Sequence, residues 1–272
     1  MQARLGAALF LGFYAAAALA SAAAAADALD AIRSRGTLVV GTKADYQPFG
    51  FRDAAGTIVG FEPDLAAEVA RRLGTKLTLV PVVAANRMQL LAQGSVDLVI
   101  ATMNDTPERR KQADFVEPSY YASGVNVLAA KSLHLHVWQE LQGRKVCTIG
   151  AAFYVTEIRQ RYAPQILAFQ LTNELYDALK SGRCDAAVYD DTALIGQLQS
   201  PAWSDYEMPL RSILVEPWGM AVKLGETRLA GLLSELVAEW HKSGFILALE
   251  QKWHIPPSAY AKEMHLRYLG GQ

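Results

Sequence analysis

The sequence predicts an α/β protein of two lobes, each built on a parallel or mixed sheet flanked by helices. Three observations support this prediction. Short apolar runs alternate with segments of helical periodicity, the connections between them are short, and the pattern restarts after residues 120–124. A third block after Trp218 suits completion of the first lobe by the C-terminal segment.

The first block predicts a β-α-β-α-β unit. Buried strands are expected at 37–42, 76–81 and 96–101. A helix begins at Phe61, because the apolar residues at 65, 66, 69, 70 and 73 repeat at helical spacing before Gly74 ends it. A second helix is expected at 86–93. Thr106 followed by Pro107 is typical of the beginning of a third.

The second block repeats this alternation. Its expected strands are 125–129, 145–149, 166–170 and 185–189. Its expected helices are 138–141, 153–162, 174–180 and one that begins at Asp191. After the apolar run at 218–222, two further helices are expected at 227–243 and 245–252. This order predicts a parallel sheet with helices on its faces in each lobe.

Composition excludes several classes of protein. The 272 residues carry 26 Lys and Arg against 27 Asp and Glu, so nucleic acid is not the expected partner. With 51% apolar and 19% charged residues, the chain is not typical of disorder. No apolar run of about 20 residues follows residue 26, so we expect the mature chain not to span a membrane.

Residues 1–26 predict a signal peptide for export. Arg4 is the only charged residue before Asp27, residues 5–20 are apolar, and small residues follow up to Ala26. This is the layout of a secretory signal peptide. A membrane anchor is the alternative, although the alanine-rich end is only weakly apolar. We expect removal of the segment and a protein free in an oxidising compartment, which suggests a bacterial periplasm.

The two cysteines are expected to pair, because cysteines of exported proteins are usually oxidised. Cys147 lies in one predicted strand, and Cys184 comes directly before another. If these strands are neighbours, a disulfide is within reach. It would close a loop of about 36 residues and contribute roughly 3 kcal/mol. Two separate buried thiols are the alternative.

Catalytic and metal-binding motifs do not stand out. The chain has no G-x-S-x-G elbow, no phosphate-binding G-x-x-x-x-G-K-[ST] and no H-E-x-x-H. His134 and His136 form a fragment of a metal site, but no third ligand is near. We therefore expect a binding protein that uses no metal and no cofactor.

Eight runs along the chain carry a resemblance to a known family. They are LVVGTKADYQPF (38–49), GFEPDLA (60–66), GSVDLVIA (94–101), TPERRKQADF (106–115), PSYYASG (118–124), GRCDAAVYD (182–190), PWGMAV (217–222) and GFILALEQKW (244–253). Residues 30–256 resemble the bacterial solute-binding protein family 3, the polar amino-acid receptors of ATP-driven importers.

The resemblance implies the type II periplasmic-binding-protein fold, with two lobes joined by two crossovers. Lobe 1 would comprise residues 27–119 and 221–272, and lobe 2 residues 125–215. The hinges would be 120–124 and 216–220. The implied protein is a monomeric periplasmic receptor that closes around an amino acid and delivers it to the permease of an ABC transporter.

The resemblance also implies that the amino acid is held by its two charged groups. Arg109 matches the family's carboxylate-binding position. Its place in the first turn of a predicted helix is a separate reason, because a cation there is disfavoured unless it shares an anion with the helix N–H groups. Asp190 matches the acceptor of the ammonium group, at the carboxyl end of a predicted strand, where open α/β sheets bind ligands.

Other implied contacts surround these two residues. Tyr46 would pack on the ligand side chain, the carbonyl of Thr102 and the side chain of Asn104 would face it, and Lys43 would pair with an acidic side chain. Where the family has hydroxyl groups, this chain has Gly150-Ala-Ala-Phe, which leaves the amides of Ala152 and Phe153 as donors. Second-tier candidates are Asp191, which suits a helix cap, Phe49, which suits core packing, and Asn86.

Lys43 and the pair Asn86-Arg87 resemble the glutamate and aspartate receptors of the family, and this resemblance implies an acidic or polar amino acid. The missing hydroxyl groups leave room for a larger or non-standard solute. A cyclohexadienyl dehydratase on the same fold is the enzymatic alternative, with Asp190 or Glu62 as its general acid. Sensory domains of this fold are a further alternative, but they are fused to a transmembrane helix.

Overall fold

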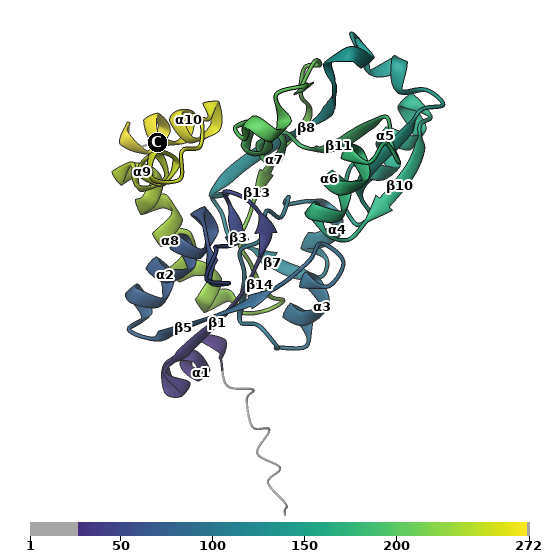
Figure 1. Cartoon of the computed structure of the whole chain (residues 1–272). Coiled ribbons are helices and arrows are strands. Elements are labelled where there is room, and N and C mark those ends of the chain that lie inside the picture. Colours follow the sequence, from purple (N-terminus) through teal and green to yellow (C-terminus); the bar gives the residue numbers. More distant parts are fainter. Residues whose placement is uncertain (1–26, 271–272) are drawn as a thin grey trace, which may run out of the picture.

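The computed structural model describes residues 27–270, which form two α/β lobes. Figure 1 shows the first lobe with the purple, blue and yellow segments, and the second lobe with the teal and green ones. The predicted signal peptide, residues 1–26, lies outside the described residues. Within the described part, no helix is both long and apolar enough to cross a membrane.

The first lobe is built on a five-stranded mixed sheet in the order β5-β1-β6-β14-β7. Its strands are β1 (Thr37–Thr42), β5 (Lys76–Pro81), β6 (Leu98–Val99), β7 (Ala113–Phe115) and β14 (Ala221–Lys223). β1 runs parallel to β5 and β6, as predicted, whereas β14 runs antiparallel to β6 and β7. The C-terminal segment therefore completes this sheet, and β6 is shorter than the expected 96–101.

Seven helices belong to the first lobe among the described residues: α1 (Ala28–Arg35), α2 (Phe61–Leu73), α3 (Arg87–Ala92), α4 (Pro107–Arg110), α8 (Thr227–Ser243), α9 (Phe245–Lys252) and α10 (Ala259–Leu269). The apolar stripe of α2 is buried, and Gly74 ends the helix in the left-handed conformation. The Thr106 side chain accepts a hydrogen bond from the Arg109 N–H, as a helix cap does. Helices α1 and α10 were not predicted.

A small antiparallel sheet precedes α2 and was also not predicted. Its strands are β2 (Asp45–Tyr46), β3 (Gly50–Arg52) and β4 (Ile58–Val59). Strands of two or three residues show no periodicity that a sequence can reveal. This sheet holds the segment after β1 against the second lobe, as described below.

The second lobe has a six-stranded sheet in the order β10-β9-β11-β8-β12, with β13 also paired to β8. The strands are β8 (Tyr121–Ala130), β9 (Lys145–Ile149), β10 (Gln165–Phe169), β11 (Ala186–Asp190), β12 (Tyr206–Glu207) and β13 (Ile213–Trp218). β10, β9 and β11 are parallel, and β11 pairs antiparallel with β8. The parallel part was predicted, whereas β12 and β13 were not.

The helices of the second lobe connect these strands. They are η1 (Lys131–Leu133), η2 (Trp138–Leu141), α5 (Val155–Tyr162), α6 (Thr172–Lys180), α7 (Asp191–Leu198) and η3 (Pro201–Trp203). η2, α6 and α7 lie where helices were expected, and α5 begins two residues later than predicted.

A disulfide joins Cys147 of β9 to Cys184, just before β11, with the Cα atoms 5.8 Å apart. β9 and β11 are parallel neighbours, with Ala187 opposite Cys147. The two strands are therefore neighbours, as the prediction required, and the predicted pairing of the cysteines is confirmed.

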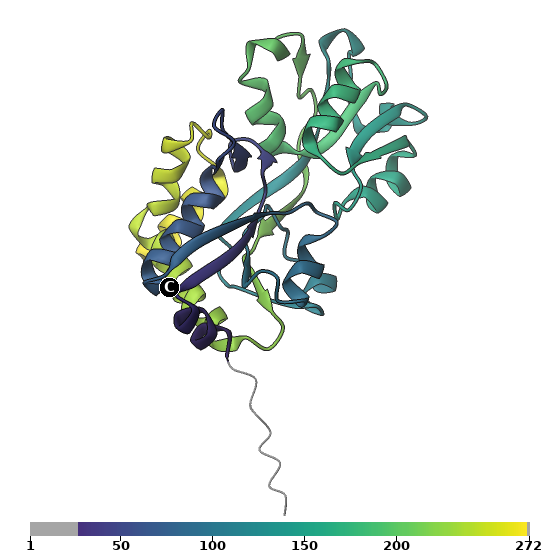
Figure 2. The ribbon, with the colours of Figure 1, turned by 60° about the horizontal axis from the view of Figure 1, so that its bottom comes forward.

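Strands β8 and β13 join the two lobes. They pair antiparallel, with Trp218 opposite Tyr121 and Glu216 opposite Ser123. Aromatic rings gather at this junction, where Trp218 packs against Tyr121 and Phe49. Figure 2 shows the lobes on either side of this connection. The predicted hinges, 120–124 and 216–220, fall on this ribbon and its ends.

Candidate functional site

A small cavity between the lobes collects six of the predicted site residues. Its volume is about 20 Å³, room for about one water molecule. The residues that line it are Lys43, Ala84, Arg87, Thr102, Asn104 and Arg109 from the first lobe, and Ile149, Ala152, Tyr189 and Asp190 from the second.

The cavity lies at the carboxyl ends of parallel strands in both sheets. Lys43 directly follows β1, Ile149 ends β9 and Asp190 ends β11. Thr102 comes three residues after β6 and has a φ of 45°, in the left-handed region that is unusual for a residue other than glycine. Strand ends of this kind are where open α/β sheets bind ligands.

Arg109 provides a cationic group from α4. Its Nη1 donates a 2.7 Å hydrogen bond to the carbonyl oxygen of Asn104. Burial lowers the pKa of Arg109, while the charges of Asp190 and Asp105 raise it. Among residues 27–270, no carboxylate lies within ion-pair distance of Arg109. Its guanidinium can therefore receive an anion.

Asp190 provides a carboxylate from the second lobe. It is 8% exposed, and its Oδ2 accepts a 3.2 Å hydrogen bond from the hydroxyl of Tyr46. Burial, together with the charge of Asp191, raises the pKa of Asp190 to about 7. A buried acid with this pKa is favourably ionised once a cation reaches it.

Tyr46 bridges the lobes rather than lining the cavity. Its hydroxyl also forms a 2.7 Å hydrogen bond with Oγ1 of Thr192, at the beginning of α7. Its ring packs against Tyr189 at 5.4 Å and against Phe49 at 5.7 Å. Tyr46 therefore orients Asp190, and the direct ligand contact expected for it stays a prediction.

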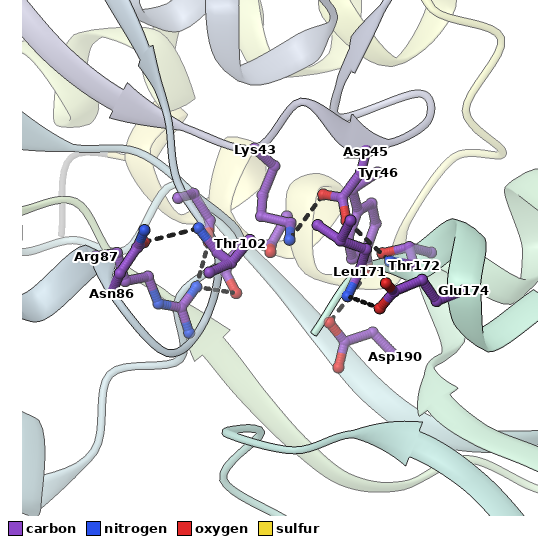
Figure 3. Close-up of polar contacts among 12 residues, drawn as sticks. Lys43, Asp45, Tyr46, Asn86, Arg87, Thr102, Leu171, Thr172, Glu174 and Asp190 are labelled. Atoms are coloured by element: carbon purple, nitrogen blue, oxygen red, sulfur yellow. Dashed lines mark hydrogen bonds and ion pairs between the residues drawn. The ribbon is translucent and has the colours of Figure 1, made fainter. Parts of the chain in front are cut away.

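Lys43 is buried and paired with a carboxylate of its own chain. Its Nζ lies 2.8 Å from Oδ1 of Asp45, and its side chain is 3% exposed. Asp45 in turn accepts a 2.9 Å hydrogen bond through Oδ2 from the backbone N–H of Thr172, which begins α6 in the other lobe. Figure 3 shows this chain of contacts from Lys43 to Thr172. The expected pairing of Lys43 with an acidic ligand stays a prediction.

Arg87 lines the cavity, although the sequence indicated it only as the neighbour of Asn86. It is buried, and its Nη1 donates to the carbonyl oxygens of Ala101 and Thr102. Burial, and then the charge of Arg109, lower the pKa of Arg87 to about 10. On a helix as short as α3, the sequence carries no signal that distinguishes an Arg that lines a cavity from one that faces solvent.

Glu62 supports the wall from behind. Its Oε1 accepts 2.5 Å hydrogen bonds from the N–H of Thr102 and the hydroxyl of Tyr120. Burial raises the pKa of Glu62 to about 7, although these two hydrogen bonds and the charge of Arg87 lower it. Glu62 therefore fixes the strained Thr102 backbone from outside the cavity.

Three of the groups predicted to face a ligand already have partners: the Thr102 carbonyl, the Asn104 side chain and the Ala152 N–H. The Asn104 carbonyl accepts from Arg109, and the Asn104 Nδ2 reaches the carbonyl of Glu216 at 3.5 Å. The N–H of Ala152 donates to the carbonyl of Ile149 at 3.1 Å. Ala152 lines the cavity, but its N–H could donate to a ligand only after its hydrogen bond to Ile149 breaks.

Four further candidates lie outside the cavity lining. Phe153 packs on Tyr154, and Phe49 is fully buried among aromatic rings. The Asn86 Oδ1 accepts from the N–H of Val83. Asp191 begins α7, but its Oδ1 accepts from Gly124 N and Ser123 Oγ on β8, so the expected helix cap is wrong.

A larger cavity of about 750 Å³ has Tyr46 in its lining. Its lining includes Asp45, Thr172, Tyr176 and Trp203. The charged pair Arg109 and Asp190 does not line it. Within residues 27–270, no cluster of three His, Cys, Asp or Glu side chains is arranged to hold a metal ion.

Comparison with known proteins gives a consistent result. Residues 38–256 match the family model of the bacterial extracellular solute-binding proteins, family 3. The chain is 30% identical over 234 residues to the ABC transporter glutamine-binding protein GlnH of Bacillus subtilis (strain 168), covering 84% of each protein. It is 29% identical over 258 residues to the L-cystine-binding protein TcyJ of Escherichia coli (strain K12), covering 92% of this chain and 96% of that protein.

A solved structure shares the fold. It is the ancestral amino acid-binding protein AncCDT-1, described as a precursor of cyclohexadienyl dehydratase. The two structures superpose with a TM-score of 0.74 at 30% identity, covering 84% of this chain and 99% of that one.

Proposed function

This chain belongs to the bacterial extracellular solute-binding proteins, family 3, and we propose that it is the periplasmic receptor of an ABC importer for a polar amino acid. The observation that carries the proposal is the placement of two opposite charges. Arg109 from one lobe and Asp190 from the other line the same cavity at the strand ends. A free amino acid carries the two complementary charges on adjacent groups.

Arg109 would bind the ligand carboxylate. A guanidinium offers two parallel donors that match a carboxylate, and the ion pair compensates for the loss of water around both groups. To reach the ligand, Nη1 of Arg109 would leave the Asn104 carbonyl. That carbonyl then becomes free to accept a hydrogen bond from the ligand ammonium.

Asp190 would bind the ligand ammonium. Its Oδ2 is oriented by Tyr46, and the new cation would return its pKa toward the usual range of a carboxyl group. The ligand thus requires partners on both lobes. Only a closed protein can supply them together, so binding shifts the balance between open and closed forms.

Closure would take place about residues 120–124 and 216–220. The present cavity is much smaller than an amino acid, so the lobes must separate for a ligand to enter. Hinge closure of this kind is a known behaviour of periplasmic binding proteins. Direct contacts of Asp45 with Thr172 and of Tyr46 with Thr192 would close the cleft behind the ligand.

The proposed partner of the closed form is a membrane permease. Export by the segment 1–26 would place the protein in the periplasm, where a disulfide is stable. We propose that it acts there as a monomer. The related proteins named above bind glutamine and cystine, and these names support a polar amino acid as the ligand.

A thermal-shift screen of the purified mature protein against the twenty amino acids tests the proposal. A ligand at 100 times its dissociation constant stabilises the native state by about 2.7 kcal/mol. At least one polar amino acid should raise the melting temperature. If none of them does, the proposed function is wrong.

Cyclohexadienyl dehydratase activity is the second candidate function. Asp190 favours it, because a buried carboxyl with a pKa of about 7 can act as a general acid at neutral pH. Incubation with prephenate or arogenate, followed by ultraviolet absorbance, separates the two functions. Formation of an aromatic product would favour the dehydratase, and its absence would favour the receptor.

A further inference from the structure

Among the described cations that line the cavity, Lys43 is the one that forms an ion pair with a carboxylate of the protein. Its Nζ is 2.8 Å from Asp45, which begins β2 two residues further along the chain. Because the Lys43 side chain is almost fully buried, water does not screen this pair well. The protein itself has thus supplied the partner that an acidic ligand would otherwise provide.

Asp45 is in turn held in place by the second lobe. Its Oδ2 accepts the N–H of Thr172 at the beginning of α6, a contact between residues 127 positions apart. The free N–H groups at a helix beginning favour a negative charge. Asp45 is therefore tied to Lys43 on one side and to α6 on the other, and closure of the lobes keeps it there.

Each cation around the cavity has a carboxyl group nearby without any ligand: Lys43 has Asp45, Arg87 has Glu62, and Arg109 has Asp190. A zwitterion with a neutral side chain adds no net charge to this set. A side-chain carboxylate adds one negative charge, which would have to share Lys43 with Asp45 in a buried place.

We infer that Asp45 is a specificity-determining residue, which occupies Lys43 and so makes the site select amino acids with neutral polar side chains over their acidic counterparts. This inference rests on the proposed function, because it concerns the ligand of the same cavity. The sequence predicted that Lys43 pairs with an acidic side chain of the ligand, whereas this inference has Lys43 paired with Asp45 instead.

The test is the ratio of affinities for an amide and its matching acid. We would titrate glutamine against glutamate, and asparagine against aspartate, into the wild-type mature protein at pH 7.5 by calorimetry. The wild type should bind the amide of a pair more tightly than the acid. Tighter binding of the acid by the wild type would overturn the inference and leave the receptor function intact.

Asp45→Asn is the decisive variant. The amide keeps the shape of the side chain and an oxygen for the Thr172 N–H, but it removes the charge that balances Lys43. The affinity ratio should move toward the acid by about tenfold or more. Asp64→Asn is the matched control, since Asp64 pairs with Lys252 at 2.7 Å and does not line the cavity. Its ratio should stay that of the wild type.

The double variant Lys43→Gln/Asp45→Asn shows whether the change in the affinity ratio depends on the Lys43 cation. Without the Lys43 cation, the gain for acidic ligands should disappear. An unchanged ratio in Asp45→Asn, or a gain that survives in the double variant, would overturn the inference. If no amino acid binds the wild type at all, it is the proposed function that fails.

Discussion

Arg109 and Arg110 are adjacent residues of α4 with different surroundings. Arg109 lines the cavity, and within residues 27–270 its guanidinium is bonded only to the carbonyl oxygen of Asn104. Arg110 is more exposed and pairs with Asp105 and Glu117. Replacing each arginine in turn therefore distinguishes a loss of ligand binding from the general effect of removing a positive charge.

Arg109→Ala should abolish the thermal shift caused by the ligand without unfolding the protein. The reason is that a buried carboxylate would lose its guanidinium partner. Arg110→Ala, measured in the same assay, should keep the shift, because surface ion pairs contribute little. A full shift in Arg109→Ala would show that the carboxylate assignment is wrong.

Asp190 should make ligand binding depend on pH. With the lobes closed and no ligand bound, burial raises the pKa of Asp190 to about 7, so the ligand ammonium must expel a proton from this form below that pH. The affinity should then fall by roughly tenfold for each pH unit below 7. Calorimetry at pH 6 in buffers of different ionisation enthalpy measures the released proton, and a value of zero would contradict this role.

The same pKa sets the sign of the effect on stability. The folded-state pKa of Asp190 lies above the unfolded value of 3.8, so the bound proton stabilises the fold at low pH. This contribution is complete below about pH 4 and is lost as the pH rises through about 7. Ligand binding acts in the opposite direction, because it favours the ionised carboxylate.

At the scale of residues, the runs that carry the family resemblance predicted a good part of the candidate site. Lys43 follows β1 and Asp190 ends β11, at strand ends that line the cavity, and α4 brings Arg109 to the same cavity. The pairing of Asp45 with Thr172 had no local signal, since the two residues are 127 positions apart. Which side chains face the cavity depends on packing from the other lobe, and this excluded Phe49 and Phe153 from its lining.

At the scale of elements, helix α7 approaches the first lobe closely at one glycine. A Cβ added at Gly196 would lie 2.9 Å from the carbonyl oxygen of Gln47 and 3.0 Å from Cδ of Pro48. Backbone atoms cannot give way cheaply at such distances. The contact of α7 with the turn after β2 therefore requires a residue without a side chain.

Gly196→Ala should weaken ligand binding about tenfold, because the added methyl group separates the lobes in the closed form. The measurement is the dissociation constant by calorimetry. Gly231→Ala in α8 is the control, since within the described part of the chain nothing beyond its neighbours and the backbone of its own helix lies within 4 Å of the added Cβ. It should bind as the wild type does and be more stable by about 1 kcal/mol. Equal affinities of the two variants would contradict the role of Gly196.

Elements with strong periodicity were predicted well, and short ones were missed. β1, β5, α2, β9 and α8 have the expected bounds or nearly so, because apolar spacing and glycine ends act locally. β2, β3 and β12 have two or three residues each and form only through pairing with partners. Tertiary contacts, rather than propensity, decide such strands.

At the scale of the whole molecule, the two lobes supply opposite halves of one site. The sequence indicated two α/β blocks and a C-terminal return to the first, and β14 between β6 and β7 is that return. The resemblance, rather than periodicity, implied that the junction is a hinge. The contacts of residues 45–47 with α6 and α7 depend on the relative placement of the lobes, which no local pattern encodes.

The central claim is that one zwitterion is held by a guanidinium of one lobe and a carboxylate of the other. Calorimetric titration with the amino acid found in the screen, its methyl ester and its N-acetyl derivative tests this claim most directly, because each derivative removes one charge. Both derivatives should bind at least about 30-fold more weakly than the free amino acid. Binding of either derivative as tightly as the free amino acid would contradict the account.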